Sequence, residues 1–307
     1  MRVAVTGASG FVGGAVCRHL RAAGWQVHGY GRRVPLAGEH LRWDLTTGPL
    51  PDPPVVDAVV HAAAWVGQAA GPDAERAAAA VNLAGTGHVL DTWPDARLVL
   101  VSSASVYHPW RPQRAAAEAD APDPATVRWP GPYGRTKALA ERLVLDRRPD
   151  AAVLRPHAVY GPGDTTLLPR VLAAVRHGVL ALPGPGTQRH SLTGVQALAE
   201  ACRLAASGTA AGVFNVADAE PVALADALAA VFAARGTRVR IVPVGYRPAL
   251  LAAAAVSGLH RLRATSGEPV LTRYAAAHLA LERSFDLSRA RRLLGFRPAR
   301  TDLGSVG

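Results

Sequence analysis

The segment from Met1 to Gly14 reads MRVAVTGASGFVGG and decides the first unit of the fold. Its apolar residues Val3–Val5 predict a buried strand, and three glycines follow at spacings of three and three before a helical stretch. Glycine permits the tight turn and lets the backbone approach a pyrophosphate, which then meets the positive end of the helix. The segment therefore predicts a dinucleotide-binding turn. Its contact residues are expected to be Gly7, Ser9, Gly10, Phe11, Val12 and Gly13.

Short apolar runs alternate with helical stretches through the first half of the chain. The helix expected over residues 12–23 stops at Gly24, and the other gaps are long enough for crossover helices. This alternation is typical of the α/β class, in a Rossmann-type doubly wound parallel sheet. The buried strands are expected at Val3–Val5, Gln26–Tyr30, Ala58–His61, Leu98–Ser102 and Ala152–Arg155.

The pattern loosens after Arg155, which indicates a second structural unit. We expect a dinucleotide-binding domain made of residues 1–160 plus about 190–217, because a later strand returns to the sheet. Residues of about 161–189 plus 218–307 are expected to form a smaller, discontinuous substrate-binding lobe. In this part of the chain, helices are expected over 167–178, 195–206 and 224–234, and a strand over 213–216.

A serine, a tyrosine and a lysine form the predicted catalytic trio. Lys137 is the single lysine among 34 basic residues, and it lies four residues after Tyr133. Residues four apart share a helix face, so the ammonium is expected to lower the pKa of the phenol from its usual value of about 10. The phenol then exchanges a proton with a substrate oxygen that Ser103, at a strand end, also holds.

At this point the chain resembles the extended short-chain dehydrogenase/reductases of the NAD-dependent epimerase/dehydratase superfamily. The motifs are TGASGFVG, VVHAAA at 59–64, VNLAGT at 81–86, VSSASVY at 101–107, YGRTK, and LRPHAVYGPGD at 154–164. The resemblance selects Ser103 over Ser102 as the catalytic serine, and it implies hydride transfer and a homodimer formed through the YxxxK helix. Asn82 is expected either near the cofactor or as a tie between a helix and the sheet. Further cofactor contacts are expected from Ala62, Ala63, Ala64, Asn82, Ser102, Tyr133, Lys137, Pro156, His157 and Val159.

The end of the second predicted strand bears on which cofactor is used. An acidic residue at this place would bind the adenosine ribose of NAD, but the sequence reads Tyr30-Gly31-Arg32-Arg33. Arginine accepts a 2′-phosphate instead, so NADP(H) is favoured over NAD(H). Asp44 and Leu45 are expected to contact the adenine.

The substrate is indicated by weaker signals. Dehydratases of nucleotide sugars carry an Asp-Glu pair after the catalytic hydroxyl residue, whereas this chain has Ala104-Ser105. Its C-terminal segments resemble the 3β-hydroxysteroid/sterol dehydrogenase branch and bacterial reductases of 2-alkyl-3-ketoacids, although residues 192–196 depart from that branch. The resemblance implies a hydrophobic alcohol or ketone, with the apolar helix of residues 246–262 beside the pocket. Substrate contacts are expected from Trp65, Ser105, His157, Arg170, Arg189 and His190.

Two other functions stay open. A nucleotide-sugar epimerase or 4-ketoreductase would use Arg170 or Arg189 to bind a diphosphate. A non-catalytic dinucleotide sensor is compatible with the fold, because fold does not fix function. The intact trio favours an enzyme over the sensor.

Composition excludes several other classes. The formal charge is +11, but the arginines are scattered, so we expect no nucleic-acid partner. The two cysteines lack metal-type spacing, which predicts no metal site and a cytoplasmic location. The apolar run of 249–259 is about half of the ~20 residues that a membrane span needs, so no stable membrane insertion is expected. No leader pattern precedes the first strand, and we expect nothing before the fold.

Overall fold

Seven parallel strands form the central sheet of the computed structural model, which describes residues 1–32, 40–67, 69–262 and 272–304. The strand order β12-β7-β5-β4-β1-β2-β3 reverses direction between β1 and β4, which is the topological switch point of such sheets. The predicted α/β, Rossmann-type fold class is thereby confirmed. The strands are β1 Arg2–Thr6, β2 Gln26–Gly31, β3 His40–Arg42, β4 Ala58–His61, β5 Arg97–Val101, β7 Ala152–Pro156 and β12 Gly212–Val216.

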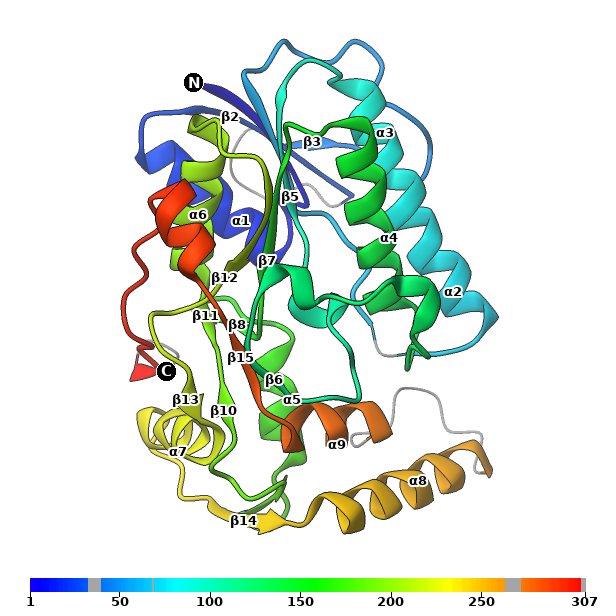
Figure 1. Cartoon of the computed structure of the whole chain (residues 1–307), viewed down its shortest axis with the longest axis vertical. Coiled ribbons are helices and arrows are strands. Elements are labelled where there is room, and N and C mark those ends of the chain that lie inside the picture. Colours follow the sequence, from blue (N-terminus) through cyan, green and yellow to red (C-terminus); the bar gives the residue numbers. More distant parts are fainter. Residues whose placement is uncertain (33–39, 68, 263–271, 305–307) are drawn as a thin grey trace.

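Helices cover both faces of this sheet (Figure 1). In β1, Val3 and Val5 pack toward α1 and α6, whereas Ala4 packs toward α3 and α4. Parallel strands that are buried on both faces are apolar without alternation, which explains the continuous runs in the sequence. One layer contains α1 Phe11–Ala22 and α6 Val195–Ser207; the other contains α2 Pro72–Ala78, a π-helical stretch Ala79–Ala84, α3 Gly85–Thr92 and α4 Pro132–Arg147.

Smaller sheets and helices build a second lobe beyond the carboxyl ends of the central strands (Figure 1). β6 Gln113–Ala116 joins this lobe by pairing with β15 Arg283–Phe285, although the two lie far apart in sequence. Residues 290–296 return to pack on the central sheet. The division into two domains at the predicted boundaries stays a prediction. The other β-strands and α-helices described are β8 Val159–Tyr160, β9 Val179–Pro183, β10 Arg189–His190, β11 Thr193–Gly194, β13 Val222–Ala223, β14 Arg240–Val244, α5 Leu167–Ala174, α7 Leu224–Ala234, α8 Tyr246–Leu262 and α9 Arg273–Ala280.

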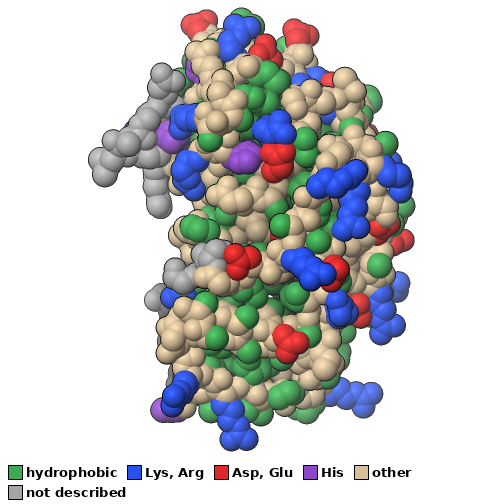
Figure 2. Space-filling model, turned by 90° about the vertical axis from the view of Figure 1, so that its left-hand side faces the viewer, with side chains coloured by type: hydrophobic (Ala, Val, Ile, Leu, Met, Phe, Trp, Pro, Cys, Tyr) green, Lys and Arg blue, Asp and Glu red, His purple; other side chains and the backbone are tan. Residues whose placement is uncertain are grey.

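The helix α8 lies at the outer edge of the second lobe (Figure 1). Its Ala249 and Ala253 pack against Ala276 of α9. Within the described ranges, no helix combines the length and the apolar character that crossing a membrane requires. On the face shown in Figure 2, cationic side chains are scattered among acidic, apolar and uncharged ones.

The close approach of α1 to the first turn requires glycine at position 13. A Cβ atom on Gly13 would lie 2.2 Å from the carbonyl oxygen of Gly7, which is backbone and cannot rotate away. We therefore expect Gly13→Ala to lower the free energy of unfolding by about 1–3 kcal/mol and to weaken dinucleotide binding. Gly87→Ala is the matched control, because a Cβ on that helical glycine meets nothing within 4 Å. Urea denaturation and cofactor titration should show loss only for Gly13→Ala; equal behaviour of the two variants would contradict the packing argument.

Candidate active site

A cavity of about 1600 Å³ runs from the first glycine turn to the second lobe. Most of the predicted cofactor residues line it. Asn82 is not among the described lining residues, and Arg33 lies outside the described part of the chain. The predicted cofactor residues in the lining are Gly7, Ser9, Gly10, Phe11, Val12, Gly13, Arg32, Asp44, Leu45, Ala62, Ala63, Ala64, Ser102, Tyr133, Lys137, Pro156, His157 and Val159.

The glycine turn presents backbone amides to this cavity. Gly7 has a φ of 73°, which favours glycine, and its carbonyl oxygen accepts a 2.8 Å hydrogen bond from the Gly10 amide. Gly10 caps α1 without a side-chain hydrogen bond, and no acidic residue occupies the first turn. The amides of the first turn of α1, which have no partner inside the helix, and the positive end of the helix dipole therefore suit an anionic pyrophosphate.

One end of the cavity, where β2 and β3 finish, suits an adenosine. Arg32 and Asp44 both line it. The Asp44 carboxylate accepts hydrogen bonds from the backbone amide and the hydroxyl of Thr46, at 3.0 and 2.8 Å, and these bonds lower its pKa. This end thus combines the Asp44 carboxylate with the Arg32 guanidinium. The carboxylate can contact an adenine base, and the guanidinium can contact a ribose or its phosphate.

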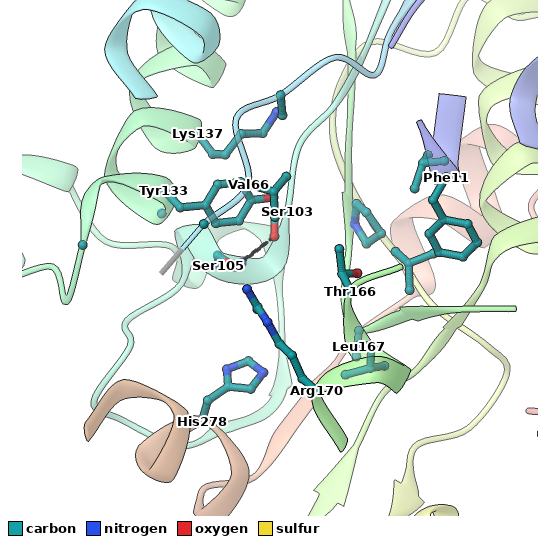
Figure 3. A pocket seen from close by; sticks show the side chains of 18 of the residues that line it. Phe11, Val66, Ser103, Ser105, Tyr133, Lys137, Thr166, Leu167, Arg170 and His278 are labelled. Carbon is teal, nitrogen blue, oxygen red and sulfur yellow. Dashed lines mark hydrogen bonds between the residues drawn. The ribbon is translucent and has the colours of Figure 1, made fainter. Parts of the chain in front are cut away.

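At the centre of the cavity, the structure brings the predicted catalytic trio together (Figure 3). Tyr133 and Lys137 lie one turn apart on α4, and the Tyr133 ring points toward Ser103 at the end of β5. The Ser103 hydroxyl donates a 3.0 Å hydrogen bond to the Ser105 hydroxyl. By contrast, the Ser102 hydroxyl is bonded to the buried carboxylate of Glu141. The geometry favours Ser103 as the hydroxyl that meets a substrate.

Burial shifts the pKa values of this pair in opposite directions. Lys137 is 2% exposed, and desolvation lowers its pKa to about 8, while the Glu141 carboxylate opposes this shift. Its ammonium donates a 2.7 Å hydrogen bond to the Val101 carbonyl oxygen. Burial also raises the pKa of Tyr133, although its hydrogen bond to Ser103 lowers it. The expected lowering of the Tyr133 pKa is therefore wrong for this structure, because desolvation of the phenolate outweighs the other influences.

The sequence interpretation missed Glu141. Arg155 donates to this carboxylate through Nε and through Nη2, the latter at 2.6 Å, and both side chains are buried. Glu141 lies four residues after Lys137 on α4, so helical spacing alone could have placed it beside the trio. Through Ser102 and Arg155, it ties the carboxyl ends of β5 and β7 to the middle of α4.

Two further missed residues come from α9. His278 and Tyr274 both line the cavity. The Tyr274 phenol is hydrogen-bonded to Ser105, and burial raises its pKa. The sequence around α9 contributes only to a family resemblance and has no spacing that indicates a role for either residue; tertiary packing brings these side chains to the catalytic serines.

Buried His157 and His190 meet half-buried His278 at this wall. The His157 Nδ1 atom lies 2.5 Å from the Ser191 carbonyl oxygen and must carry the proton, so its Nε2 accepts from His278 Nε2 at 3.2 Å. The rings of His157 and His190 lie 5.8 Å apart, and His190 is 2% exposed. Desolvation lowers the pKa of His157 to about 4 and that of His190 to about 3. Among the described residues, no group of histidine, cysteine and carboxylate side chains is arranged to hold a metal ion.

The remaining predicted substrate residues divide into two groups. Ser105 and Arg170 line the cavity together with His157. Trp65 and Asn82 bond to each other through the Trp65 backbone, and Asn82 also donates to the Thr136 hydroxyl at 2.9 Å, so this amide ties a loop to α4. The described cavity lining includes neither Trp65 nor Asn82.

The described cavity lining includes neither Arg189 nor His190, and none of the described side chains of α8. Arg189 is exposed and donates to the carbonyl oxygen of Pro221. The expectation that the apolar helix of residues 246–262 lies beside the pocket stays a prediction, because the side chains of residues 257–262 lie outside the described part of the chain. The described alanines of α8 pack against α9, which itself faces the cavity.

Comparison with known proteins agrees with this geometry. The model of the NAD dependent epimerase/dehydratase family matches residues 3–217. A 2-alkyl-3-oxoalkanoate reductase from Stenotrophomonas maltophilia is 31% identical, covering 97% of this chain and 95% of the relative. A 3 beta-hydroxysteroid dehydrogenase/Delta 5-->4-isomerase from Mycobacterium tuberculosis is 30% identical, and the match covers 97% of this chain and 86% of the relative. The solved structure of MoeE5 in complex with UDP-glucose and NAD has a TM-score of 0.72 at 26% identity, covering 100% of this chain and 96% of that one.

The fold and the site thus define an enzyme of the extended short-chain dehydrogenase/reductase type, which works with a nicotinamide dinucleotide. The chain belongs to the NAD-dependent epimerase/dehydratase family.

The buried histidines make stability sensitive to acid. His61, His157 and His190 are at most 5% exposed, and burial lowers each pKa to between about 3 and about 4. They stay neutral in the native state, whereas the unfolded chain binds protons below its ordinary pKa of about 6.5. We expect the free energy of unfolding to fall as pH drops from about 6.5 toward about 4, by up to about 1.4 kcal/mol per pH unit for each histidine.

Urea denaturation at several pH values in this range measures how steeply the free energy of unfolding changes with pH. His190→Leu should reduce this pH dependence by the contribution of one histidine. His177→Gln, at an exposed position, should leave the pH dependence unchanged. An unchanged slope in His190→Leu would show that this imidazole does not remain neutral on folding.

Proposed function

We propose that this enzyme is an NAD(P)-dependent ketoreductase that interconverts a hydrophobic ketone and its secondary alcohol. The observation that carries the proposal is the convergence of Ser103, Tyr133 and Lys137 in a cavity that also contains the glycine turn. When bound, the nicotinamide would supply or accept the hydride. The residues of the glycine turn would hold its pyrophosphate, and Lys137 would lie beneath the reacting end.

The protonation states favour proton donation to a ketone. Burial raises the pKa of Tyr133, so its phenol stays protonated and can donate to the developing alkoxide. Lys137 lies one turn below and provides positive charge up to its pKa of about 8. The Ser103 hydroxyl faces the same space and can hold the carbonyl oxygen in line with the phenol.

The wall contributed by the second lobe supports a hydrophobic substrate. Its apolar members come from α5, β9, α7 and α9, and they belong to one packed cluster. The named relatives reduce 2-alkyl-3-oxoalkanoates or dehydrogenate 3 beta-hydroxysteroids, both of which are largely apolar. The lining residues that belong to this cluster are Val171, Ala174, Leu180, Leu182, Leu228 and Leu279.

Removal of the phenol tests this function. Tyr133→Phe should lower kcat for ketone reduction by about 100-fold or more, because the variant cannot donate the proton. Nicotinamide absorbance is followed with 3-oxo acids, 3-ketosteroids and nucleotide sugars, and the variant's melting temperature and cofactor binding serve as controls. Equal turnover by the variant, or no turnover of any ketone by the wild-type enzyme, would refute the proposal.

We further propose that NADP(H) is preferred over NAD(H). Support comes from Arg32, which lines the adenosine end of the cavity where an acid would select NAD. Arg32→Ser should lower kcat/KM for NADPH by about 10- to 100-fold and change that for NADH little, since one charged partner of the 2′-phosphate is lost. Arg42→Ser is the control, because Arg42 is exposed and lies outside the described lining. A wild-type enzyme that uses NADH better would contradict this preference.

A nucleotide-sugar epimerase is the second candidate, favoured by the likeness to MoeE5 in complex with UDP-glucose. In that case Arg170 would bind a diphosphate, and a nucleotide sugar would be isomerised without net change in nicotinamide absorbance. The homodimer through α4 and the cytoplasmic location stay predictions.

A further inference from the structure

Four hydroxyl groups form a chain through the centre of the cavity. The phenol of Tyr133 is hydrogen-bonded to Ser103, and the Ser103 hydroxyl donates to that of Ser105 at 3.0 Å (Figure 3). The Ser105 hydroxyl is in turn hydrogen-bonded to the phenol of Tyr274. All four side chains line the same cavity, but Tyr274 alone comes from α9 of the second lobe. The chain therefore joins the catalytic phenol to a second phenol that the proposed reaction does not yet use.

Neighbouring side chains fix the direction of the Tyr274 ring. Thr272 caps α9 by accepting a 3.0 Å hydrogen bond from an amide of the first turn, the turn that carries Tyr274. The Trp110 ring meets the Tyr274 ring edge to face, with centroids 6.5 Å apart, and its indole N–H donates to the Arg128 carbonyl oxygen at 2.8 Å. The His278 ring lies 5.6 Å from the Tyr274 ring on another side. These contacts hold the Tyr274 hydroxyl at Ser105.

The protons of the two serines limit how Ser103 can hold a ketone. In the structure the Ser103 hydroxyl gives its one proton to Ser105, while Ser103 accepts from the Ser105 backbone amide at 3.1 Å. To hold a ketone oxygen, Ser103 has to turn this proton toward the ketone. The two hydroxyls then stay bonded only if Ser105 becomes the donor, and the Ser105 oxygen can at the same time accept from Tyr274.

We propose that Tyr274 is a positioning residue for the ketoreductase reaction: its phenol donates to Ser105, Ser105 donates to Ser103, and the Ser103 hydroxyl is thereby directed at the ketone oxygen. Successive donors in such a chain polarise one another, so Ser103 becomes a stronger donor to the developing alkoxide than a lone serine. The inference rests on the proposed function and adds to it a residue that acts through Ser103.

The two phenols have different tasks in this arrangement. Burial raises the pKa of Tyr274 and that of Tyr133, so both phenols are protonated near neutral pH. Tyr133 transfers its proton to the substrate, and the Lys137 ammonium lies one helical turn away on α4. Tyr274 keeps its proton and shares it with Ser105. Loss of the Tyr274 hydroxyl should therefore slow the chemical step without abolishing it.

The test measures hydride transfer in a single turnover. The full-length enzyme, loaded with NADPH or NADH, whichever it uses better, is mixed with the 3-oxo acid or 3-ketosteroid that it reduces fastest, and nicotinamide absorbance is followed by stopped flow. A cofactor deuterated at the transferred position shows whether hydride transfer limits this rate, and KM is measured in the steady state. The variants are Tyr274→Phe, Ser103→Ala, Ser105→Ala, Ser105→Thr, and the two double variants that combine Tyr274→Phe with each change of serine to alanine.

We expect Tyr274→Phe to slow hydride transfer by about 3- to 10-fold, as the loss of one hydrogen bond implies, and to change KM by less than about twofold. In the Ser103→Ala and Ser105→Ala backgrounds the same change should slow the reaction by less than about 1.5-fold, because the group through which Tyr274 acts is gone. Ser105→Thr keeps a hydroxyl and should stay within about threefold of the wild type.

Tyr160→Phe is the matched control. The Tyr160 phenol donates to Asp218 at 2.8 Å and accepts from the backbone amide of Asp302 at 3.0 Å, and Tyr160 lies outside the described cavity lining. We expect this variant to melt at a lower temperature than the wild type and to transfer hydride at the wild-type rate. The comparison separates the loss of a structural phenol from the loss of the hydroxyl chain.

Equal losses from Tyr274→Phe in the wild-type and serine-variant backgrounds would overturn the proposal. A higher KM at an unchanged rate would also overturn it, because Tyr274 would then be only a wall of the substrate site. Both results leave the ketoreductase function standing. Failure of the wild type to reduce any ketone would overturn that function and, with it, this role of Tyr274.

Discussion

A buried ion pair beneath the active site determines where the catalytic groups lie. Glu141 of α4 and Arg155 of β7 are 4% and 6% exposed, and their closest N–O distance is 2.6 Å. Ser102, directly after β5, bonds to the same carboxylate. Removal of one partner from such a pair costs about 3–5 kcal/mol, so the three elements are held firmly together at this depth. The Ser102 hydroxyl is directed to Glu141 of α4, and the hydroxyl of the next residue, Ser103, is directed into the cavity.

The same carboxylate maintains the charge state of the site. Burial favours neutral Lys137, and Glu141 is the charge that works against this, leaving its pKa at about 8. The cation persists near neutral pH beneath a phenol whose own pKa burial has raised. A protonated donor above a fixed cation is the arrangement that a developing alkoxide requires. Structural support and catalytic electrostatics thus depend on one buried residue.

The sequence predicted the central sheet well because buried parallel strands are apolar on both faces. The five predicted strands correspond to β1, β2, β4, β5 and β7, and the glycine turn is specified by close backbone approaches, both within the turn at Gly13 and between Gly7 and the backbone of Ala62 and Ala63. The packing partner of α8 could not be predicted from its apolar run, since hydrophobicity shows that a helix is packed but not what it packs against; its alanines pack on α9. Tyr274 and His278 were missed for the same reason: their proximity to Ser105 arises from tertiary contacts that no local pattern encodes.

Those tertiary contacts run through the strand pair β6 and β15. Buried Arg283 of β15 donates to the carbonyl oxygens of His108, Pro109 and Arg111, in the segment that follows the catalytic serines. Asn215 reinforces the junction, donating to the Ala116 carbonyl oxygen and accepting from the Tyr107 hydroxyl.

The helix α9 directly precedes β15, so these bonds fix Tyr274 and His278 relative to Ser105 although more than 150 residues separate them. The acid–base groups depend on Glu141 inside the first lobe, whereas the substrate-facing groups depend on this second junction. Changes in α5 or α9 can therefore alter which ketone is accepted without moving the groups that transfer the proton.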